Sequence, residues 1–193
     1  MERRIFLKSL TYTGGLVGTA GLLTSCKSST AATDESFEQD EPLVRAGAEF
    51  EAMGIKTYEV AYNSGLLTDQ AVIDTAVAFL QDHTDHLTEL NTLLQSNGFD
   101  TVDPTNADPD PGVGGVSNQT DVLEVALNVE FLAATFYFSG IVNQIKSEQA
   151  RRVFANILPV ETAHFVTYKN VLGLSPAIDG SVFENLSSGL ELV

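Results

Sequence analysis

The sequence has no tryptophan, one cysteine, three histidines and few basic residues. A single cysteine excludes disulfide stapling within a monomer. Ten lysines and arginines stand against 26 aspartates and glutamates, for a net charge of −16, and no basic run follows the first residues. This balance argues against nucleic-acid binding through phosphates and indicates a solvated acidic surface. The 193 residues, 44% of them hydrophobic, suffice for one domain with a sizeable core.

Residues 1–26 are typical of an export signal rather than of a folded segment. Arg3 and Arg4 precede a mildly apolar, glycine-rich run that is too short for a good transmembrane helix and ends at Cys26. This segment resembles a twin-arginine signal, and "LTSC" resembles the lipobox of bacterial lipoproteins. The resemblance implies export by the twin-arginine route to the periplasm or cell envelope, with Cys26 as a lipid anchor. The alternative for Cys26 is an ordinary buried or free thiol.

Residues 27–40 are small and polar, and we expect a flexible tether there. The apolar periodicity after it predicts four helices. The first helix begins at an Asp40 cap and reaches about residue 64, and the second begins at Thr68 or Asp69 and ends at residues 96–98. The third helix is capped by Thr120. The fourth covers about 147–172, with a kink or a lost backbone hydrogen bond at Pro159. About 22 residues rich in proline and glycine separate the second helix from the third, which predicts a long irregular crossover.

Six ionisable residues lie on the apolar stripes of these helices: Glu51, His83, His86, Glu130, Glu161 and His164. Their spacing repeats along the chain. The offset between equivalent residues is constant to within one position in the pairs Glu51/Glu130, Tyr58/Tyr137, His83/Glu161 and His86/His164. We therefore interpret the chain as a duplicated helix pair, with the six side chains meeting inside a four-helix bundle. Three carboxylates and three imidazoles in an apolar interior favour a bound divalent metal ion, which offsets their desolvation.

The pattern resembles the ferritin-like di-iron and di-manganese carboxylate proteins, which place a Glu on one helix and Glu-x-x-His on the next and join two helix pairs by a long crossover. The resemblance covers about residues 40–173, including "ALNVEFLAATFYFSGI" and "ETAHFVTY". It implies an all-α, ferritin-like four-helix bundle over 41–173. The C-terminal segment, 174–193, lies outside the resemblance, and packing as a short extra segment is one interpretation of it.

The resemblance also implies a role for each of the metal-binding residues. Glu51 and Glu130 match the terminal carboxylates of the two halves, His86 matches the imidazole of the first, and Glu161 with His164 matches the full Glu-x-x-His. His83 departs from the pattern, because the family has a second bridging glutamate there. We expect either a rebalanced pair of ions or only one tightly held ion. Asp82 is an alternative ligand, although helical spacing turns it about 100° away from the stripe.

Tyr58 and Tyr137 have two interpretations: core aromatics, or side chains whose hydroxyls hold a ligand carboxylate by a hydrogen bond. The other acidic residues are expected on solvated faces.

By resemblance, the expected cofactor is iron, most simply two ions, with manganese or zinc as alternatives. The expected chemistry is metal oxidation or oxygen and peroxide chemistry, as in a ferroxidase or a peroxide-reducing oxidoreductase. One alternative is a non-enzymatic metal-binding or structural bundle at the membrane surface, holding zinc or a single ion. Another is a partner-binding module with a decaying site. Expected partners are metal ions, the membrane through lipidated Cys26, and a second copy in a homodimer.

Overall fold

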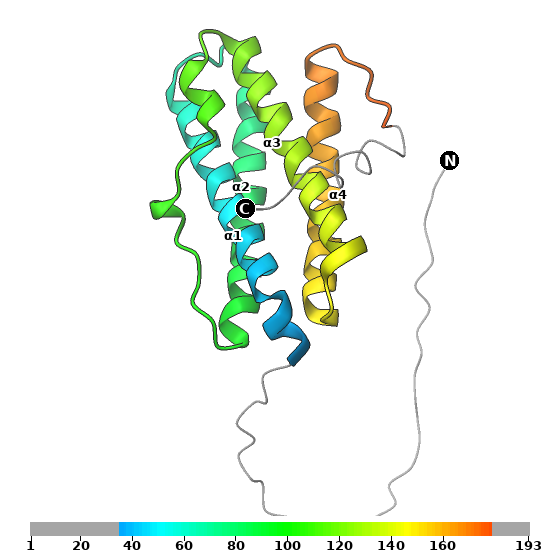
Figure 1. Ribbon diagram of the computed structural model, residues 1–193. Helices are drawn as coiled ribbons and strands as arrows, with labels where there is room; N and C mark the ends of the chain where they lie inside the picture. Colours follow the sequence, from blue (N-terminus) through cyan, green and yellow to red (C-terminus); the bar gives the residue numbers. More distant parts are fainter. Residues whose placement is uncertain (1–34, 179–193) are drawn as a thin grey trace, which may run out of the picture. The chain divides into compact units, whose positions relative to one another are not determined.

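The computed structural model describes residues 35–178, and its main elements are four long helices (Figure 1). These are α1 (Glu35–Asn63), α2 (Gln70–Ser96), α3 (Gln119–Ser139) and α4 (Glu148–Val171). No strand occurs within residues 35–178, so the expected all-α four-helix architecture is confirmed. The export signal, Cys26, most of the expected tether and the residues after 178 lie outside the described part.

The crossover between α2 and α3 gives the bundle its topology. Figure 1 shows α1 and α2 as an antiparallel hairpin, α3 and α4 as another, and the crossover returning along the outside so that α3 runs parallel to α2. Two short turns interrupt the crossover, η1 (Pro104–Asn106) and η2 (Pro111–Gly115). A π-helical turn, η3 (Gly140–Gln144), extends α3 toward α4 and was not expected from the sequence.

Capping residues set the helix starts. Asp69 caps α2 by accepting from the backbone N–H of Ala71, as one of the two expected options. The cap of α3 is Asn118 rather than the expected Thr120, because the Asn118 side chain reaches the N–H of Asp121. Ser147 caps α4, and this helix continues through Pro159 without interruption.

Asp40 does not cap α1, because that helix already begins at Glu35 and includes the last six residues of the expected tether. The Asp40 side chain is buried and accepts instead from the backbone N–H groups of Lys146, at 2.9 Å, and Ser147, at 2.6 Å. A residue of the first helix thus satisfies free donors at the start of α4.

A side chain of the second hairpin makes the equivalent contact with the first hairpin. Gln119 Oε1, at the start of α3, accepts from the backbone N–H groups of Thr68, at 2.8 Å, and Asp69, at 3.0 Å, just before α2. Gln119 is the residue equivalent to Asp40 in the second half, and Lys146 and Ser147 are equivalent to Thr68 and Asp69. The spacing of the predicted duplication therefore reappears in a reciprocal pair of tertiary contacts.

Two buried apolar clusters fill the bundle. The first cluster includes Phe37, Leu94 and Phe154, and the second includes Leu67, Val122 and Tyr168. The ionisable stripe residues of α2, α3 and α4 lie between them along each helix, and Glu51 of α1 lies beside the first cluster. Residues 119–144 are the one described stretch long and apolar enough to cross a membrane, but half of its apolar window is buried in the bundle. We therefore assign α3 as a core helix.

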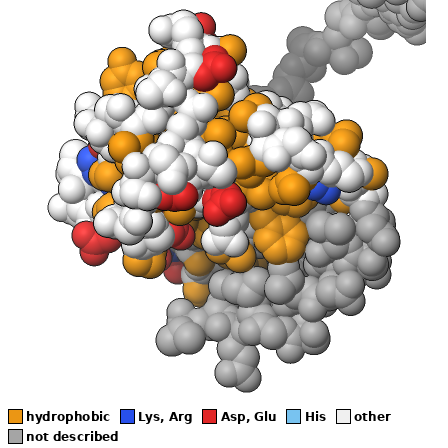
Figure 2. Space-filling model, turned by 90° about the horizontal axis from the view of Figure 1, so that it is seen from above, with side chains coloured by type: hydrophobic (Ala, Val, Ile, Leu, Met, Phe, Trp, Pro, Cys, Tyr) orange, Lys and Arg blue, Asp and Glu red, His pale blue; other side chains and the backbone are white. Residues whose placement is uncertain are grey.

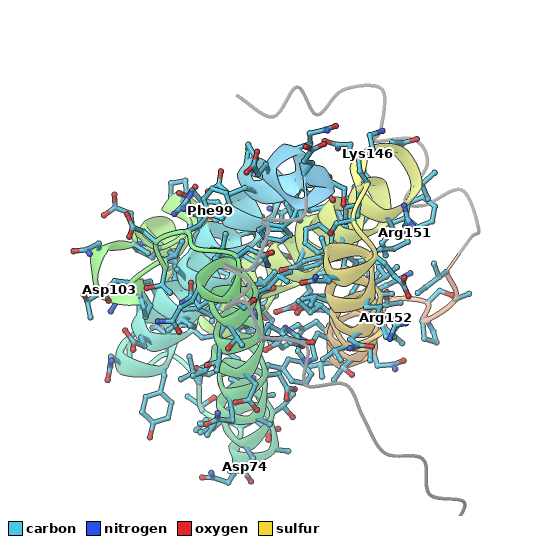
Figure 3. All side chains as sticks on the ribbon, turned by 90° about the horizontal axis from the view of Figure 1, so that it is seen from below. Asp74, Phe99, Asp103, Lys146, Arg151 and Arg152 are labelled. Atoms are coloured by element: carbon cyan, nitrogen blue, oxygen red, sulfur yellow. The ribbon has the colours of Figure 1, made fainter. Side chains whose placement is uncertain are left out.

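Charged side chains occupy the outside of the bundle. On the end seen from above, a few acidic side chains are scattered among apolar and uncharged ones (Figure 2). Lys146, Arg151 and Arg152 lie along the outer side of the start of α4 (Figure 3). The Arg152 side chain pairs with Glu148, and Arg151 donates to the carbonyl of Ile145, so both arginines are engaged locally.

Candidate metal centre

The structure brings all six predicted ligand residues together in the middle of the bundle. Each helix contributes to the set, and all six are buried, with His86 the most exposed at 7%. The residues are Glu51 from α1, His83 and His86 from α2, Glu130 from α3, and Glu161 and His164 from α4. Helical spacing therefore assigned these side chains to the correct interior face.

Two groups of four donors within this set could each hold a metal ion. One group contains Glu51, His83, His86 and Glu161, and the other contains His83, Glu130, Glu161 and His164. His83 and Glu161 belong to both groups. We call the first the Glu51 half and the second the Glu130 half.

The contacts of the Glu51 half are close but only partly hydrogen-bonded. His83 Nδ1 lies 2.7 Å from Glu51 Oε2, and His86 Nδ1 lies 2.7 Å from Glu161 Oε1. The second contact lacks the alignment of a hydrogen bond, and neither His86 Nδ1 nor either oxygen of Glu161 has a hydrogen-bond partner. Three buried polar atoms thus converge without satisfying one another.

In the Glu130 half, both oxygens of Glu130 have hydrogen-bond partners, in contrast to those of Glu161. His164 Nδ1 lies 3.1 Å from Glu130 Oε2, and His83 Nε2 lies 3.3 Å from Glu130 Oε1. The outer nitrogen of His164, Nε2, lies 3.0 Å from Asp82 Oδ2. His164 therefore stands between two carboxylates.

Asp82 acts differently from the ligand role considered for it. Its side chain is 43% exposed and reaches His164 from outside the six-residue set, in keeping with its turn away from the stripe. Carboxylates that accept from the outer nitrogen of a ligand histidine fix the ring's tautomer and orientation. The sequence held no direct signal for this contact, because the two residues are on different helices.

Each of the two tyrosines donates a hydrogen bond to a glutamate of the other helix hairpin. Tyr137 on α3 donates a short hydrogen bond to Glu51 Oε1, and Tyr58 on α1 donates one to Glu130 Oε1. Both rings are also buried in the apolar clusters. The structure thus supports both interpretations of these residues at once.

Gly54 makes room for His83 and was not found by sequence reasoning. A Cβ at position 54 would lie 3.2 Å from His83 Nδ1 and 3.3 Å from its Cε1. The residue equivalent to Gly54 in the second hairpin is Ala133 on α3, which packs against α4. The residue equivalent to His83 there is Glu161, whose side chain is narrower than an imidazole ring. The hairpin with the wider side chain thus has glycine in place of alanine.

The comparisons with known proteins agree with the four-helix fold. A protein-family model described as "Ferritin-like domain" matches residues 46–174. The chain belongs to the ferritin-like family. A crystal structure of a conserved hypothetical protein from Mycobacterium tuberculosis has the same fold, with a TM-score of 0.62, 16% identity, and coverage of 75% of this chain and 98% of that chain. No curated protein matches the sequence.

The carboxylates of this ferritin-like centre have only imidazoles as ionic partners. Within residues 35–178, every salt bridge of Glu51, Glu130 and Glu161 is to a histidine, and no lysine or arginine reaches them. Burial by itself raises the pKa of Glu51, but His83 and His86 lower that pKa to about 2. Burial and the charge of Glu51 raise the pKa of Glu161.

The pKa values of the three histidines are raised by the same contacts. Burial lowers the pKa of His86 and of His164, but the neighbouring carboxylates outweigh it and raise both values to about 9. The pKa of His83 is also raised, against burial, by Glu130 and Glu161. Without an ion, this ferritin-like centre therefore holds protons in the positions where a cation would otherwise balance the glutamates.

The donor set fits a divalent metal ion. Glutamate oxygens and imidazole nitrogens suit iron, manganese and zinc, and the unpartnered atoms of His86 and Glu161 point to where a cation would be bound.

Proposed function

We propose that this protein is an exported, lipid-anchored ferritin-like protein that binds iron or manganese and catalyses oxidation of ferrous ions or reduction of peroxide. The observation that carries the proposal is the pair of adjoining donor groups that share Glu161 in a buried interior. Family membership supports metal binding but does not by itself choose a reaction.

The protein's own residues would bind the ion and exclude water. Glu51, Glu130 and Glu161 supply negative charge, and the three histidines supply neutral nitrogens once their protons leave. The hydroxyls of Tyr137 and Tyr58 hold the two terminal glutamates in place. A bound redox-active metal ion supplies electron transfer to oxygen or peroxide, for which the apolar clusters on both sides provide a dry surrounding.

Anaerobic protein given ferrous ions and then oxygen tests the reaction. Oxygen uptake and ferric absorbance should rise faster than in buffer, and Glu161→Ala should abolish the gain because both donor groups lose the carboxylate that they share. Glu124→Ala is the matched control, since Glu124 is an exposed glutamate on α3 outside both groups. Equal rates for wild type and Glu161→Ala would reject the proposal.

A non-enzymatic metal-binding bundle is the second candidate, and His83 favours it because an imidazole replaces a bridging carboxylate. Stoichiometric zinc binding with no oxygen uptake would support this candidate.

The proposed location rests on residues 1–26. Replacement of Cys26 by serine should move the protein from the membrane fraction to the soluble fraction, and unchanged fractionation would contradict a lipid anchor at this cysteine.

A further inference from the structure

The four donors of the Glu51 half lie at distances suited to one ion. Around the ring of atoms, His83 Nδ1 to Glu51 Oε2 is 2.7 Å, Glu51 Oε2 to His86 Nδ1 is 3.6 Å, His86 Nδ1 to Glu161 Oε1 is 2.7 Å, and Glu161 Oε1 to His83 Nδ1 is 3.9 Å. Tetrahedral nitrogen and oxygen ligands about 2.0–2.1 Å from a metal ion lie about 3.3 Å from one another. The four separations lie on both sides of that value.

The Glu130 half has less need of an ion. Glu130 Oε1 accepts from Tyr58 and faces His83 Nε2, while Glu130 Oε2 faces His164 Nδ1. Both nitrogens of His83 face carboxylates, Nδ1 at 2.7 Å from Glu51 Oε2 and Nε2 at 3.3 Å from Glu130 Oε1. A carboxylate only accepts hydrogen bonds, so a bound ion that replaces the Nδ1 proton leaves the Nε2 proton in place for Glu130. The lone pair of Nδ1 is then available to an ion beside Glu51, His86 and Glu161.

An imidazole also cannot join two ions as a glutamate does. A bridging carboxylate suits ions about 3.5–4 Å apart, as is usual in paired metal sites. The two nitrogens of one imidazole direct their lone pairs away from each other across the ring, which places two bound ions farther apart than Glu161 can span. His83 therefore serves one ion, with Gly54 giving its ring the necessary space.

We propose that the centre is unequal, with one divalent ion bound tightly by Glu51, His83, His86 and Glu161, while Glu130 and His164 remain a hydrogen-bonded pair that binds an ion only weakly. The inference rests on the proposed metal binding and adds its stoichiometry and its ligand set. It does not depend on turnover, so a protein that never oxidises ferrous ions can still confirm it.

Titration of the metal-free full-length protein with Co²⁺ tests the inference. The strong visible bands of four-coordinate Co²⁺ should saturate at one equivalent. His86→Ala should remove these bands, and His164→Ala should retain them. These two histidines occupy equivalent positions in the two hairpins, so each is the control for the other. Two equal equivalents in the wild type, or loss of the bands in both variants, would overturn the proposal.

Isosteric variants test whether a loss of metal binding is caused by the lost ligand and not by unfolding. Glu51→Gln should weaken the first equivalent at least tenfold, whereas Glu130→Gln should change it less than threefold, with circular dichroism reporting the fold of each. The double variant His83→Glu, Gly54→Ala makes the first hairpin like the second at both positions and should raise the stoichiometry to two. A stoichiometry of one in the double variant would show that His83 does not cause the inequality.

Discussion

The α1–α2 hairpin has His83 at the first position of its metal-binding motif, whereas the α3–α4 hairpin has Glu161 there. Around these two residues the hairpins match closely. Each tyrosine bonds the glutamate of the other hairpin, and each hairpin caps a helix of the other. A second difference is Asp82, which accepts from His164, since the equivalent residue of the second hairpin is Val160. The contacts that hold the helices together are thus symmetric, and those of the candidate metal centre are asymmetric.

The comparison indicates which contacts can differ without cost to the fold. Reciprocal caps and tyrosine bonds fix the two hairpins against each other, and their geometry is alike on both sides. The exchange of a carboxylate for an imidazole changes the charge of the centre and the number of lone pairs available to an ion.

The reciprocal caps should differ in strength although their geometry is alike. Asp40→Ala removes a buried, charged acceptor from two backbone donors, which should lower the free energy of unfolding by about 3 kcal/mol. Gln119→Ala removes a neutral acceptor at a more exposed site, and about 1 kcal/mol is expected. Urea unfolding of both variants measures the pair, and equal losses would mean that burial and charge add nothing to the Asp40 contact.

The tyrosine bonds should matter unequally for metal affinity. Tyr137→Phe frees Glu51, a member of the tight group, and should weaken the first ion by about 10–100-fold, the usual effect of losing a contact that orients a ligand. Tyr58→Phe frees Glu130 and should change the first ion's affinity less than about threefold. Competition with a chelator of known affinity gives both numbers. The reverse order would place the tight ion in the Glu130 half.

The sequence predicted the helices and the six inward residues because apolar periodicity and a repeated spacing are local properties of the chain. The predicted start of α1 was too late. Aspartate is a common capping residue, but the Asp40 side chain accepts from the backbone N–H of Lys146, far along the chain and just before α4. Thr120 was preferred to Asn118 for a related reason: several capping residues stand side by side, and only backbone geometry selects one. Asp82 and Gly54 could not be assigned, because their partners lie across a helix interface.

In the metal-free protein, the histidines of the two halves should contribute alike to the pH dependence of stability. The pKa values of His86 and His164 are both raised to about 9 from an ordinary value near 6.5. Groups with raised pKa values stabilise the fold fully below the unfolded value and lose that contribution as the pH rises through the folded one. The melting temperature without metal should therefore fall, by roughly 5 °C, between pH 6.5 and 9.

Metal should reverse this trend, because ions bind deprotonated imidazoles and their affinity increases with pH. Differential scanning calorimetry at several pH values, with chelator or with one equivalent of Zn²⁺, separates the two regimes. A flat profile without metal would contradict charged histidines in the centre, and parallel profiles would contradict metal binding by them.

Asp82 gives the smallest expected effect and the sharpest distinction between the halves. If His164 were a ligand of the tight ion, loss of its Asp82 partner would weaken that ion by about 10–100-fold. We expect Asp82→Ala to change the affinity for the first ion less than about threefold, because His164 faces Glu130 outside the tight group. Asp85→Ala, an exposed neighbour on α2, is the control. Since the lost hydrogen bond is half-exposed, stability should fall by only about 1 kcal/mol, so a large loss of affinity could not be attributed to unfolding.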